Sequence, residues 1–233
     1  MFRHEDLVVG IGVETHALVP QQKDQAWRAG TFGLQTKVDP GSIESLRLVQ
    51  IGWAVGGISG EKPETKSRVV RPDGFVIEPS ASAKHRLHHE FALTEGKPLR
   101  DVLQEMLQDV LGAARRGGRV CAHHLEFDAT VIANEMRRAG LEEELAEWGS
   151  FVREGLCTMN PHIGSWIRAQ AGTNDVPHYI PIRLSDAVSV ILPEPGRLLS
   201  QHHDAGSDAL MHWLLFRELN RRAELSQEAP MAS

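Results

Sequence analysis

The amino-acid sequence predicts an α/β fold, in which a mixed β-sheet carries helices on its faces. Two observations support this prediction. The chain begins with three strand-like segments and then alternates helix-like and strand-like segments. Residues 7–13 are continuously apolar or glycine, as expected of a strand that is covered on both sides. With 233 residues, of which 41% are hydrophobic, the chain is long enough to bury a full core.

The N-terminal half predicts an antiparallel hairpin or meander. Residues 46–57 form a second strand that ends in glycines, and residues 65–72 form a third strand after a turn. Residues 20–45 show no regular period, so we expect a loop or an irregular insertion there. Residues 80–96 predict a short helix and a loop.

A long amphipathic helix is predicted from residue 99. Pro98 stands at its start, and Gly117 with Gly118 ends it. Its apolar stripe consists of Leu99, Val102, Leu103, Met106, Val110 and Leu111. The elements predicted after it are, in order, a strand over 119–124, helices over 126–141 and 142–152, a strand over 156–159, a helix over 161–172 and an extended loop over 173–183. A short helix over 184–194 follows, which starts at a Ser/Asp cap and is closed by Pro193. The last predicted element is a long helix over 202–225.

No repeat, low-complexity segment or linker divides the chain, so we expect a single domain over residues 1–225 and a polar C-terminal tail over residues 226–233. The two cysteines, Cys121 and Cys157, are too few for a disulfide framework and favour buried thiols in a reducing compartment. The sequence shows no signal peptide and no apolar run of the ~20 residues that a membrane span needs. We therefore expect an intracellular protein, cytoplasmic or nuclear, that does not enter a membrane.

Four acidic or histidine side chains stand near the ends of predicted elements: Glu14 ends the first strand, Asp128 begins a helix, and His203 and Asp208 begin the last helix. Side chains at element ends along one edge of a sheet can converge on one cleft. Carboxylates there would hold hard cations such as Mg²⁺ or Mn²⁺, and a nearby histidine would take a proton from water. The formal net charge of -6 disfavours binding nucleic acid through bulk charge, so such binding would be local or mediated by metal ions.

Three short motifs contain these residues in order: Gly-Val-Glu-Thr at 12–15, His-His-Leu-Glu-Phe-Asp at 123–128, and His-Asp-Ala-Gly-Ser-Asp-Ala at 203–209. Their order and spacing resemble the DEDDh family of 3′–5′ exonucleases, which includes RNase T and the proofreading subunit of bacterial DNA polymerase III. The family motifs are Asp-x-Glu-Thr, His-Asn-x-x-Phe-Asp and His-x-Ala-x-x-Asp-Ala. The resemblance covers residues 7 to about 222. Taken singly, Glu14 is more often a surface residue at a strand end than a ligand. Asp128 alone is explained by the preference of helix N-termini for acids, and His203 with Asp208 by a solvated helix start, but the combined pattern favours the site.

The resemblance implies an RNase H-like fold, with a central mixed five-stranded sheet flanked by helices. It implies hydrolysis of phosphodiester bonds at the 3′ end of single-stranded DNA or RNA by means of two Mg²⁺ or Mn²⁺ ions. Glu14, Asp128 and Asp208 would be metal ligands, Glu14 and His203 would be catalytic, and His203 would be the general base. Phe127 would pack beneath the site. The residues that would hold the 3′-terminal nucleotide are Thr15, His16, Ala17 and Leu18. Family exonucleases are often homodimers, and the loop at residues 20–45 is a candidate contact.

The sequence departs from the family pattern at two positions. His124 replaces the common asparagine, and Gly12 replaces the first aspartate, which in the family usually touches both metal ions. The second departure removes a negative charge and a bridging ligand, so we expect weak or absent activity and a large gain from Gly12→Asp. The alternative is a degenerate exonuclease-like module that binds nucleic acid or a protein partner without cleavage. A third interpretation, ranked lowest, is that Gly12 was introduced on purpose to capture an uncleaved complex.

Several other histidines are interpreted as ordinary polar or packed residues when each is taken alone: His16, His123, His124 and His202.

Overall fold

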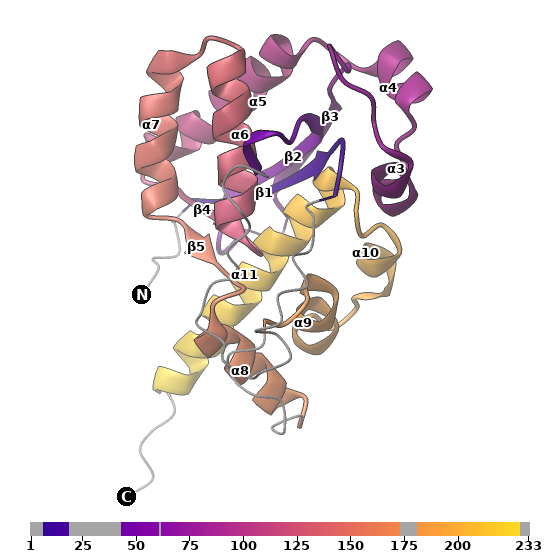
Figure 1. Cartoon of the computed structure of the whole chain (residues 1–233). Helices are drawn as coiled ribbons and strands as arrows, with labels where there is room; N and C mark the ends of the chain where they lie inside the picture. The colour runs from indigo at the N-terminus through magenta and orange to yellow at the C-terminus, as the bar shows by residue number, and fades with distance from the viewer. Residues whose placement is uncertain (1–6, 19–42, 61, 173–180, 229–233) are drawn as a thin grey trace, which may run out of the picture.

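The computed structural model describes residues 7–18, 43–60, 62–172 and 181–228, without the side chains of 224–228 (Figure 1). Most of the predicted loop at 20–45, residues 173–180 of the predicted extended loop and residues 229–233 of the predicted tail lie outside the described residues. Residues 226–228, which we assigned to the tail, belong to the last helix. The single-domain assignment of residues 1–225 stays a prediction.

A mixed five-stranded sheet forms the centre of the molecule, with the strand order β3-β2-β1-β4-β5. Its central strand β1 pairs antiparallel with β2 and parallel with β4, β2 pairs antiparallel with β3, and β4 pairs parallel with β5. The strands are β1 (Leu7–Thr15), β2 (Leu48–Gly57), β3 (Glu64–Val69), β4 (Arg119–Ala122) and β5 (Leu156–Cys157). The predicted α/β class, the N-terminal meander and the mixed sheet are therefore confirmed.

Helices cover both faces of this sheet (Figure 1). The helices are α3 (Pro79–His85), α4 (His89–Glu95), α5 (Leu99–Ala114), α6 (Leu125–Arg138), α7 (Glu142–Arg153), α8 (Pro161–Gln170), α9 (Leu184–Ile191), α10 (Gly196–Ser200) and α11 (Ala205–Glu228). Helices α5, α6 and α7 lie on one side of the sheet, and the long helix α11 crosses the other side. Within the described residues, no helix is both long enough and apolar enough to span a bilayer. The predicted intracellular location stays a prediction.

Most predicted elements are present with ends shifted by a few residues, and three features differ from the prediction. Residues 80–96 form parts of two helices, α3 and α4, rather than one helix and a loop. Helix α9 begins directly after Arg183 with no side-chain cap, so the predicted Ser/Asp cap is wrong. Buried Leu184 occupies the first position of α9 and packs into an apolar cluster, which places the serine inside the helix. The short helix α10 was not predicted.

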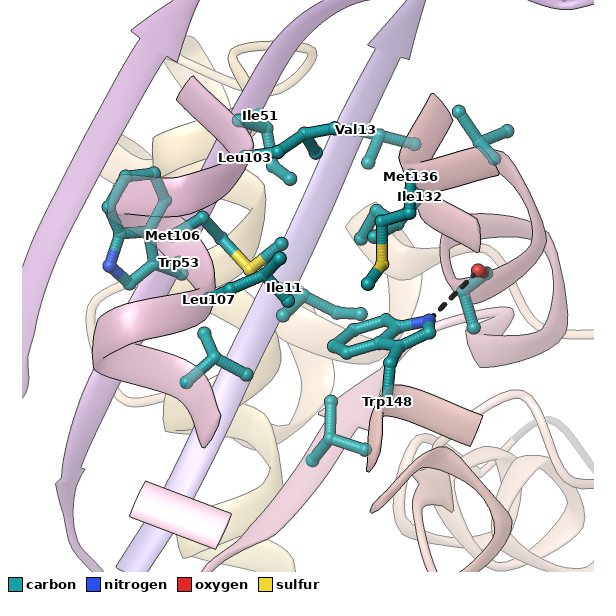
Figure 2. Packing of buried hydrophobic residues seen from close by; sticks show 14 of the residues in the cluster. Ile11, Val13, Ile51, Trp53, Leu103, Met106, Leu107, Ile132, Met136 and Trp148 are labelled. Carbon is teal, nitrogen blue, oxygen red and sulfur yellow. Dashed lines mark hydrogen bonds between the residues drawn. The ribbon is translucent and has the colours of Figure 1, made fainter. Parts of the chain in front are cut away.

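The main hydrophobic core lies between the sheet and helices α5–α7 (Figure 2). Strand β1 contributes Val9, Ile11 and Val13 to this core, because alternate residues of a strand point to the same face. The predicted stripe of α5 is confirmed for five of its residues, with Leu107 buried in addition and Leu99 only partly buried. Trp148 of α7 closes the core and donates a hydrogen bond to the Ala129 carbonyl, at 3.3 Å (Figure 2). Full burial of each large side chain contributes about 1.5–3 kcal/mol.

The opposite face of the sheet is covered by α11 at very short range. Gly10 of β1 and Gly52 of β2 point toward this helix. A Cβ atom on either glycine would lie 2.2 Å from a helix carbonyl oxygen, that of Ala209 for Gly10 and that of Ala205 for Gly52. The first turns of α11 therefore rest directly on the strand backbones, which no larger residue at these positions would permit.

Candidate metal centre

The end of strand β1 has backbone groups that no neighbouring strand binds. Parallel pairing with β4 covers only residues Val8 to Gly10 of β1. Beyond Gly10, side chains form the hydrogen bonds to the backbone of β1. The Val13 N–H donates to Asp128 Oδ1 at 3.1 Å, and His212 Nδ1 donates to the Ile11 carbonyl at 2.6 Å. The short β4 thus opens the sheet where β1 ends, and α6 and α11 each supply a side chain that binds the exposed strand edge.

Asp128 reaches this position from the first turn of α6. The turn before α6 places His124 in the left-handed conformation, with φ of 90°. Asparagine and histidine both occur more often in that conformation than most residues, which gives a physical reason for either of them at position 124. The Asp128 side chain is 6% exposed, and burial raises the pKa of its carboxyl well above its usual value, against the hydrogen bond from Val13.

Glu14 follows Val13 and points to the α11 side of the sheet. It is 8% exposed, and its Oε1 atom lies 4.0 Å from His203 Nδ1. Burial, helped by the negative charge of Asp208 and opposed by Lys84, raises the pKa of Glu14 to about 8. Asp128 raises that pKa further. The structure therefore brings together the three predicted carboxylates, which come from β1, α6 and α11.

Asp208 lies in the first turn of α11, where the preceding turn wraps around it. Its Oδ1 atom accepts a hydrogen bond from the His203 N–H at 3.2 Å and lies 2.9 Å from His202 Nδ1. His203 has φ of 70°, a left-handed conformation that folds the chain back toward the helix start. Burial, followed by the nearby His202, lowers the pKa of His203 to about 4, so its imidazole is neutral at neutral pH.

Two residues that sequence reasoning missed hold the start of α11 on the sheet. Asp204 caps the helix by accepting a hydrogen bond from the Ser207 N–H at 2.9 Å. Gln50 of β2 binds both sides of this cap, because its Nε2 donates to Asp204 Oδ2 at 2.7 Å and its Oε1 accepts from the Ala205 N–H at 3.0 Å. Asp204 stands in the third motif just before the helix, so the sequence alone could have indicated the cap. The hydrogen bond between Asp204 and Gln50 could not be foreseen, because the two residues are far apart in the chain.

Gly12 faces the same group of side chains. A Cβ atom at this position would lie 3.3 Å from Asp208 Cβ, so a carboxylate there would enter the cluster. The same Cβ would lie 2.8 Å from the Ala205 carbonyl oxygen and 3.2 Å from the Ala209 nitrogen. A side chain at position 12 therefore requires that α11 moves away from β1. The predicted gain in activity from Gly12→Asp depends on this movement.

The four residues predicted to hold a nucleotide follow the strand end. Thr15 is buried and donates from Oγ1 to the Ala17 carbonyl at 2.8 Å, and His16 Nδ1 accepts a hydrogen bond from the Arg47 N–H at 3.1 Å. Ala17 packs partly against the main core, and Leu18 is 43% exposed. The Thr15 and His16 side chains are thus committed to local contacts, and Leu18 presents the most apolar surface. Their role in nucleotide binding stays a prediction.

The histidines of the second motif have structural contacts. His123 lies between Thr158 Oγ1, at 3.1 Å, and the Ile182 carbonyl, at 2.7 Å. His124 stacks on Phe127 with ring centroids 5.9 Å apart, and Phe127 packs at the margin of the main core. These positions agree with the interpretation of His123 and His124 as packed residues and of Phe127 as structural. Cys121 and Cys157 are free thiols, of which Cys121 is fully buried.

A basic segment at the end of α3 borders the cluster, and sequence reasoning missed it. His85 Nε2 donates to the Thr15 carbonyl at 3.3 Å, and Arg86 donates to the Ser200 carbonyl at 3.3 Å. The segment therefore extends from the end of β1 to the end of α10. Lys84 and Arg86 are both exposed on it, and Lys84 lies close enough to Glu14 and His203 to lower the pKa of each.

We compared the chain with known proteins. No protein-family model matches it, and no curated protein matches it in sequence. Solved structures of E. coli exonuclease I do match in fold. The zinc-bound complex with single-stranded DNA has a TM-score of 0.64 at 14% identity over 94% of this chain and 41% of that chain. The complex with a dT13 oligonucleotide has a TM-score of 0.65 at 13% identity over 95% of this chain and 43% of that chain.

A product-bound structure of exonuclease I gives a similar result, with a TM-score of 0.64 at 13% identity, over 95% of this chain and 45% of that chain. This chain therefore spans less than half of the length of the exonuclease I chains that it matches. At this level of identity the likeness establishes the fold. The predicted RNase H-like fold, with its mixed five-stranded sheet flanked by helices, is confirmed.

Proposed function

We propose that this chain is a metal-dependent exonuclease-type domain that hydrolyses phosphodiester bonds at the 3′ end of single-stranded DNA or RNA, with an activity weakened by Gly12. One observation carries the proposal. Glu14, Asp128 and Asp208 come from three elements far apart in the sequence and meet beside His203 at the end of β1. Three carboxylates and an imidazole gathered at the end of a strand suit the hydrolysis of a phosphodiester.

The three carboxylates have the donor chemistry for one Mg²⁺ or Mn²⁺ ion. Among the described residues, the group that already offers three ligand atoms within 4.8 Å of one another is His202, His203 and Asp208, so Glu14 and Asp128 would move toward the ion. Glu14, Asp128 and Asp208 would hold it through oxygen, which hard cations prefer. Burial, followed by the charge of Asp208, raises the pKa of Glu14 when no cation balances these charges. A bound ion would polarise the phosphate and stabilise the negative charge that develops there. The second ion of the family has one carboxylate fewer available, because position 12 carries no side chain.

His203 would act as the general base in this proposal. Its neutral imidazole can accept a proton at Nε2 from the attacking water, and Glu14 near Nδ1 would stabilise the imidazolium that results. The low pKa makes His203 a weaker base than an unperturbed histidine, which also favours a slow reaction. The His203 N–H bond to Asp208 would hold the turn, and hence the ring, in place.

Single-stranded DNA is the first substrate to test, because the matching exonuclease I structures include complexes with single-stranded DNA oligonucleotides. The exposed cations Lys84 and Arg86 beside the cluster would attract the phosphates of a strand end. A homodimer formed through residues 20–45 stays a prediction.

The experiment uses 5′-labelled single strands with Mg²⁺ or Mn²⁺. We expect slow shortening from the 3′ end that chelation stops and that Asp128→Asn reduces at least a hundredfold, because this variant removes one charged ligand. Glu126→Gln is the matched control, since Glu126 is an exposed acid in the same turn of α6 and should leave the rate unchanged. If concentrated enzyme shortens no substrate, hydrolysis is contradicted.

The second candidate function is binding without cleavage, which the missing carboxylate at position 12 and the close approach of α11 favour. We expect such a module to bind a labelled single strand without shortening it. Fluorescence anisotropy with a chelator present measures that binding directly. Binding that disappears in Lys84→Ala while the fold is kept would support this candidate, and no binding to DNA or RNA would contradict it.

A further inference from the structure

Two adjacent histidines and one carboxylate form a compact group at the start of α11. His202 Nδ1 lies 2.9 Å from Asp208 Oδ1, and the rings of His202 and His203 stack with centroids 3.8 Å apart at an interplanar angle of 26°. One candidate ligand atom from each of His202, His203 and Asp208 lies within 4.8 Å of the other two. The resemblance to exonucleases gives His202 no role, and sequence reasoning interpreted it as an ordinary polar residue.

We propose that His202, His203 and Asp208 bind one divalent transition-metal ion of the Zn²⁺, Co²⁺ or Ni²⁺ class. Two imidazole nitrogens and one carboxylate oxygen form a donor set that prefers such borderline ions to Mg²⁺, which prefers oxygen. The site shares residues with the proposed nuclease centre, but its existence does not require that the chain cleaves nucleic acid.

The distances suit a shared ion after small side-chain rotations. Two atoms that each lie about 2.1 Å from one ion stand about 3.0–3.4 Å apart in octahedral or tetrahedral geometry. The His202 Nδ1 to Asp208 Oδ1 distance of 2.9 Å is already close to this range. The third donor atom lies within 4.8 Å of the other two, so a side-chain rotation suffices to bring it to the same ion.

The backbone around the site is held in advance of binding. The His202 N–H donates to the Leu199 carbonyl at 3.2 Å, the His203 N–H donates to Asp208 Oδ1 at 3.2 Å, and the cap formed by Asp204 fixes the helix start. The ligand side chains are mostly buried but reachable, with exposed fractions of 24% for His202, 31% for His203 and 13% for Asp208. A pre-organised, partly open group of this kind admits an ion without refolding.

Charge supports the same assignment. Glu14 Oε1 lies 4.0 Å from His203 Nδ1, so a second carboxylate stands beside the group. Glu14, whose raised pKa keeps it largely protonated without an ion, would release its proton when a cation binds, and its charge with that of Asp208 would then balance one divalent cation. Gly12 takes one oxygen donor away from the β1 side, whereas His202 adds a nitrogen donor on the α11 side. The donor set is therefore shifted from all-oxygen toward nitrogen.

Binding of an ion by His203 is incompatible with the role of His203 as general base. An ion on His203 uses the lone pair with which that imidazole would accept a proton, so the two roles exclude each other. Zn²⁺ at the site should therefore inhibit any cleavage supported by Mg²⁺. Conversely, the ion should bind equally well if the chain cleaves nothing.

The test titrates the full chain with Co²⁺ and follows the visible absorption of the bound ion, then displaces it with Zn²⁺ in excess Mg²⁺. We expect one ion per chain, displacement by Zn²⁺ at equimolar amounts, and no displacement by a hundredfold excess of Mg²⁺. His202→Ala should weaken Co²⁺ binding at least tenfold. His162→Ala is the matched control, because His162 is exposed on α8 outside the group and should leave the affinity unchanged.

A second measurement protects the test against variants that fold poorly. Zn²⁺ should raise the melting temperature of the wild type and of His162→Ala, but not that of His202→Ala, and His202→Gln should behave like His202→Ala. Unchanged Co²⁺ affinity in both His202 variants, or displacement by Mg²⁺, would overturn the proposal and leave His202 and Asp208 as a hydrogen-bonded pair only. Metal-dependent cleavage with no Co²⁺ site would overturn this inference alone, whereas a Co²⁺ site without cleavage would contradict hydrolysis alone.

Discussion

The two faces of strand β1 are built in opposite ways. One face presents Val9, Ile11 and Val13, whose side chains fill the main core against α5–α7. The other face presents Gly10, Gly12 and Glu14, where the strand backbone itself meets α11. Side chains on the first face keep the helices at ordinary packing distance, whereas their absence on the second face brings α11 close. We infer that the core-forming face contributes most of the stability and that the glycine face positions the site.

The cluster forms where these two packing arrangements meet. Asp128 arrives from α6, which packs with the core-forming face, and Asp208 arrives from α11, which packs on the glycine face. Both are near the end of β1 because the sheet opens beyond Gly10. If the core-forming face mainly provides stability, substitutions on that face should lower the free energy of unfolding most. Substitutions on the glycine face should lower it less, but they should alter the geometry of the metal site.

The largest expected effect is on the core-forming face. Ile11→Ala removes a fully buried side chain, so we expect a loss of about 2–5 kcal/mol in the free energy of unfolding. Urea denaturation followed by circular dichroism measures this loss. Leu18→Ala is the control, because Leu18 is 43% exposed and its truncation should change stability by about 0.5 kcal/mol or less. A loss below about 1 kcal/mol for Ile11→Ala would contradict the stabilising role of the core-forming face.

The next effect is on the helix contact. Gly10→Ala adds a Cβ at 2.2 Å from the Ala209 carbonyl, so α11 must move, and we expect a loss of about 1–3 kcal/mol. The displacement should also weaken metal binding, because Asp208 moves with the helix. Gly149→Ala in α7 is the matched control, since its Cβ meets nothing within 4 Å and should stabilise by about 0.5–1 kcal/mol. Equal behaviour of the two variants in thermal unfolding would disprove the close contact.

Position 12 separates the steric effect from the carboxylate effect. Gly12→Ala and Gly12→Asp both add a Cβ that pushes on α11, so each should lose about 1–3 kcal/mol of stability. Only the aspartate restores an oxygen ligand next to Asp208. We therefore expect Gly12→Asp to cleave single-stranded DNA at least tenfold faster than Gly12→Ala in a Mn²⁺ assay, which corresponds to about 1.4 kcal/mol of transition-state stabilisation. Equal rates would show that α11 keeps the new carboxylate out of the site.

The smallest effect lies beyond the sheet, on α11. Arg221 and then Arg222 hold the pKa of Glu218 at about 2, below its usual value of 4.5. The carboxylate therefore stabilises the fold above about pH 4.5, and this contribution is lost as the pH falls toward about 2. Glu218→Gln should lose about 0.5 kcal/mol or less at neutral pH, and the difference from wild type should vanish near pH 2. Denaturation curves across this pH range measure it; a growing difference at low pH would contradict the assignment.

Local patterns predicted most of the fold. The period of apolar residues gave α5 and its buried stripe, and continuous apolar runs gave β1 and β2. The split into α3 and α4 and the short helix α10 were missed, since seven or fewer residues carry too little periodicity to define a helix. Glu14, Asp128, His203 and Asp208 were found through the order of their motifs. Asp204, Gln50 and the metal-binding geometry of His202 were not, because each depends on a neighbour reached only after folding.

The sequence by itself determined which segments become strands or helices and which donor atoms the chain contains. It also showed that position 12 lacks a carboxylate. Only the tertiary structure decided that the glycine at this position lies under the backbone of α11, and that His202 meets Asp208. The physical reason is the distance along the chain over which each effect acts. Propensity and periodicity act over a few residues, whereas these contacts depend on how closely a helix near one end of the chain approaches a strand near the other end.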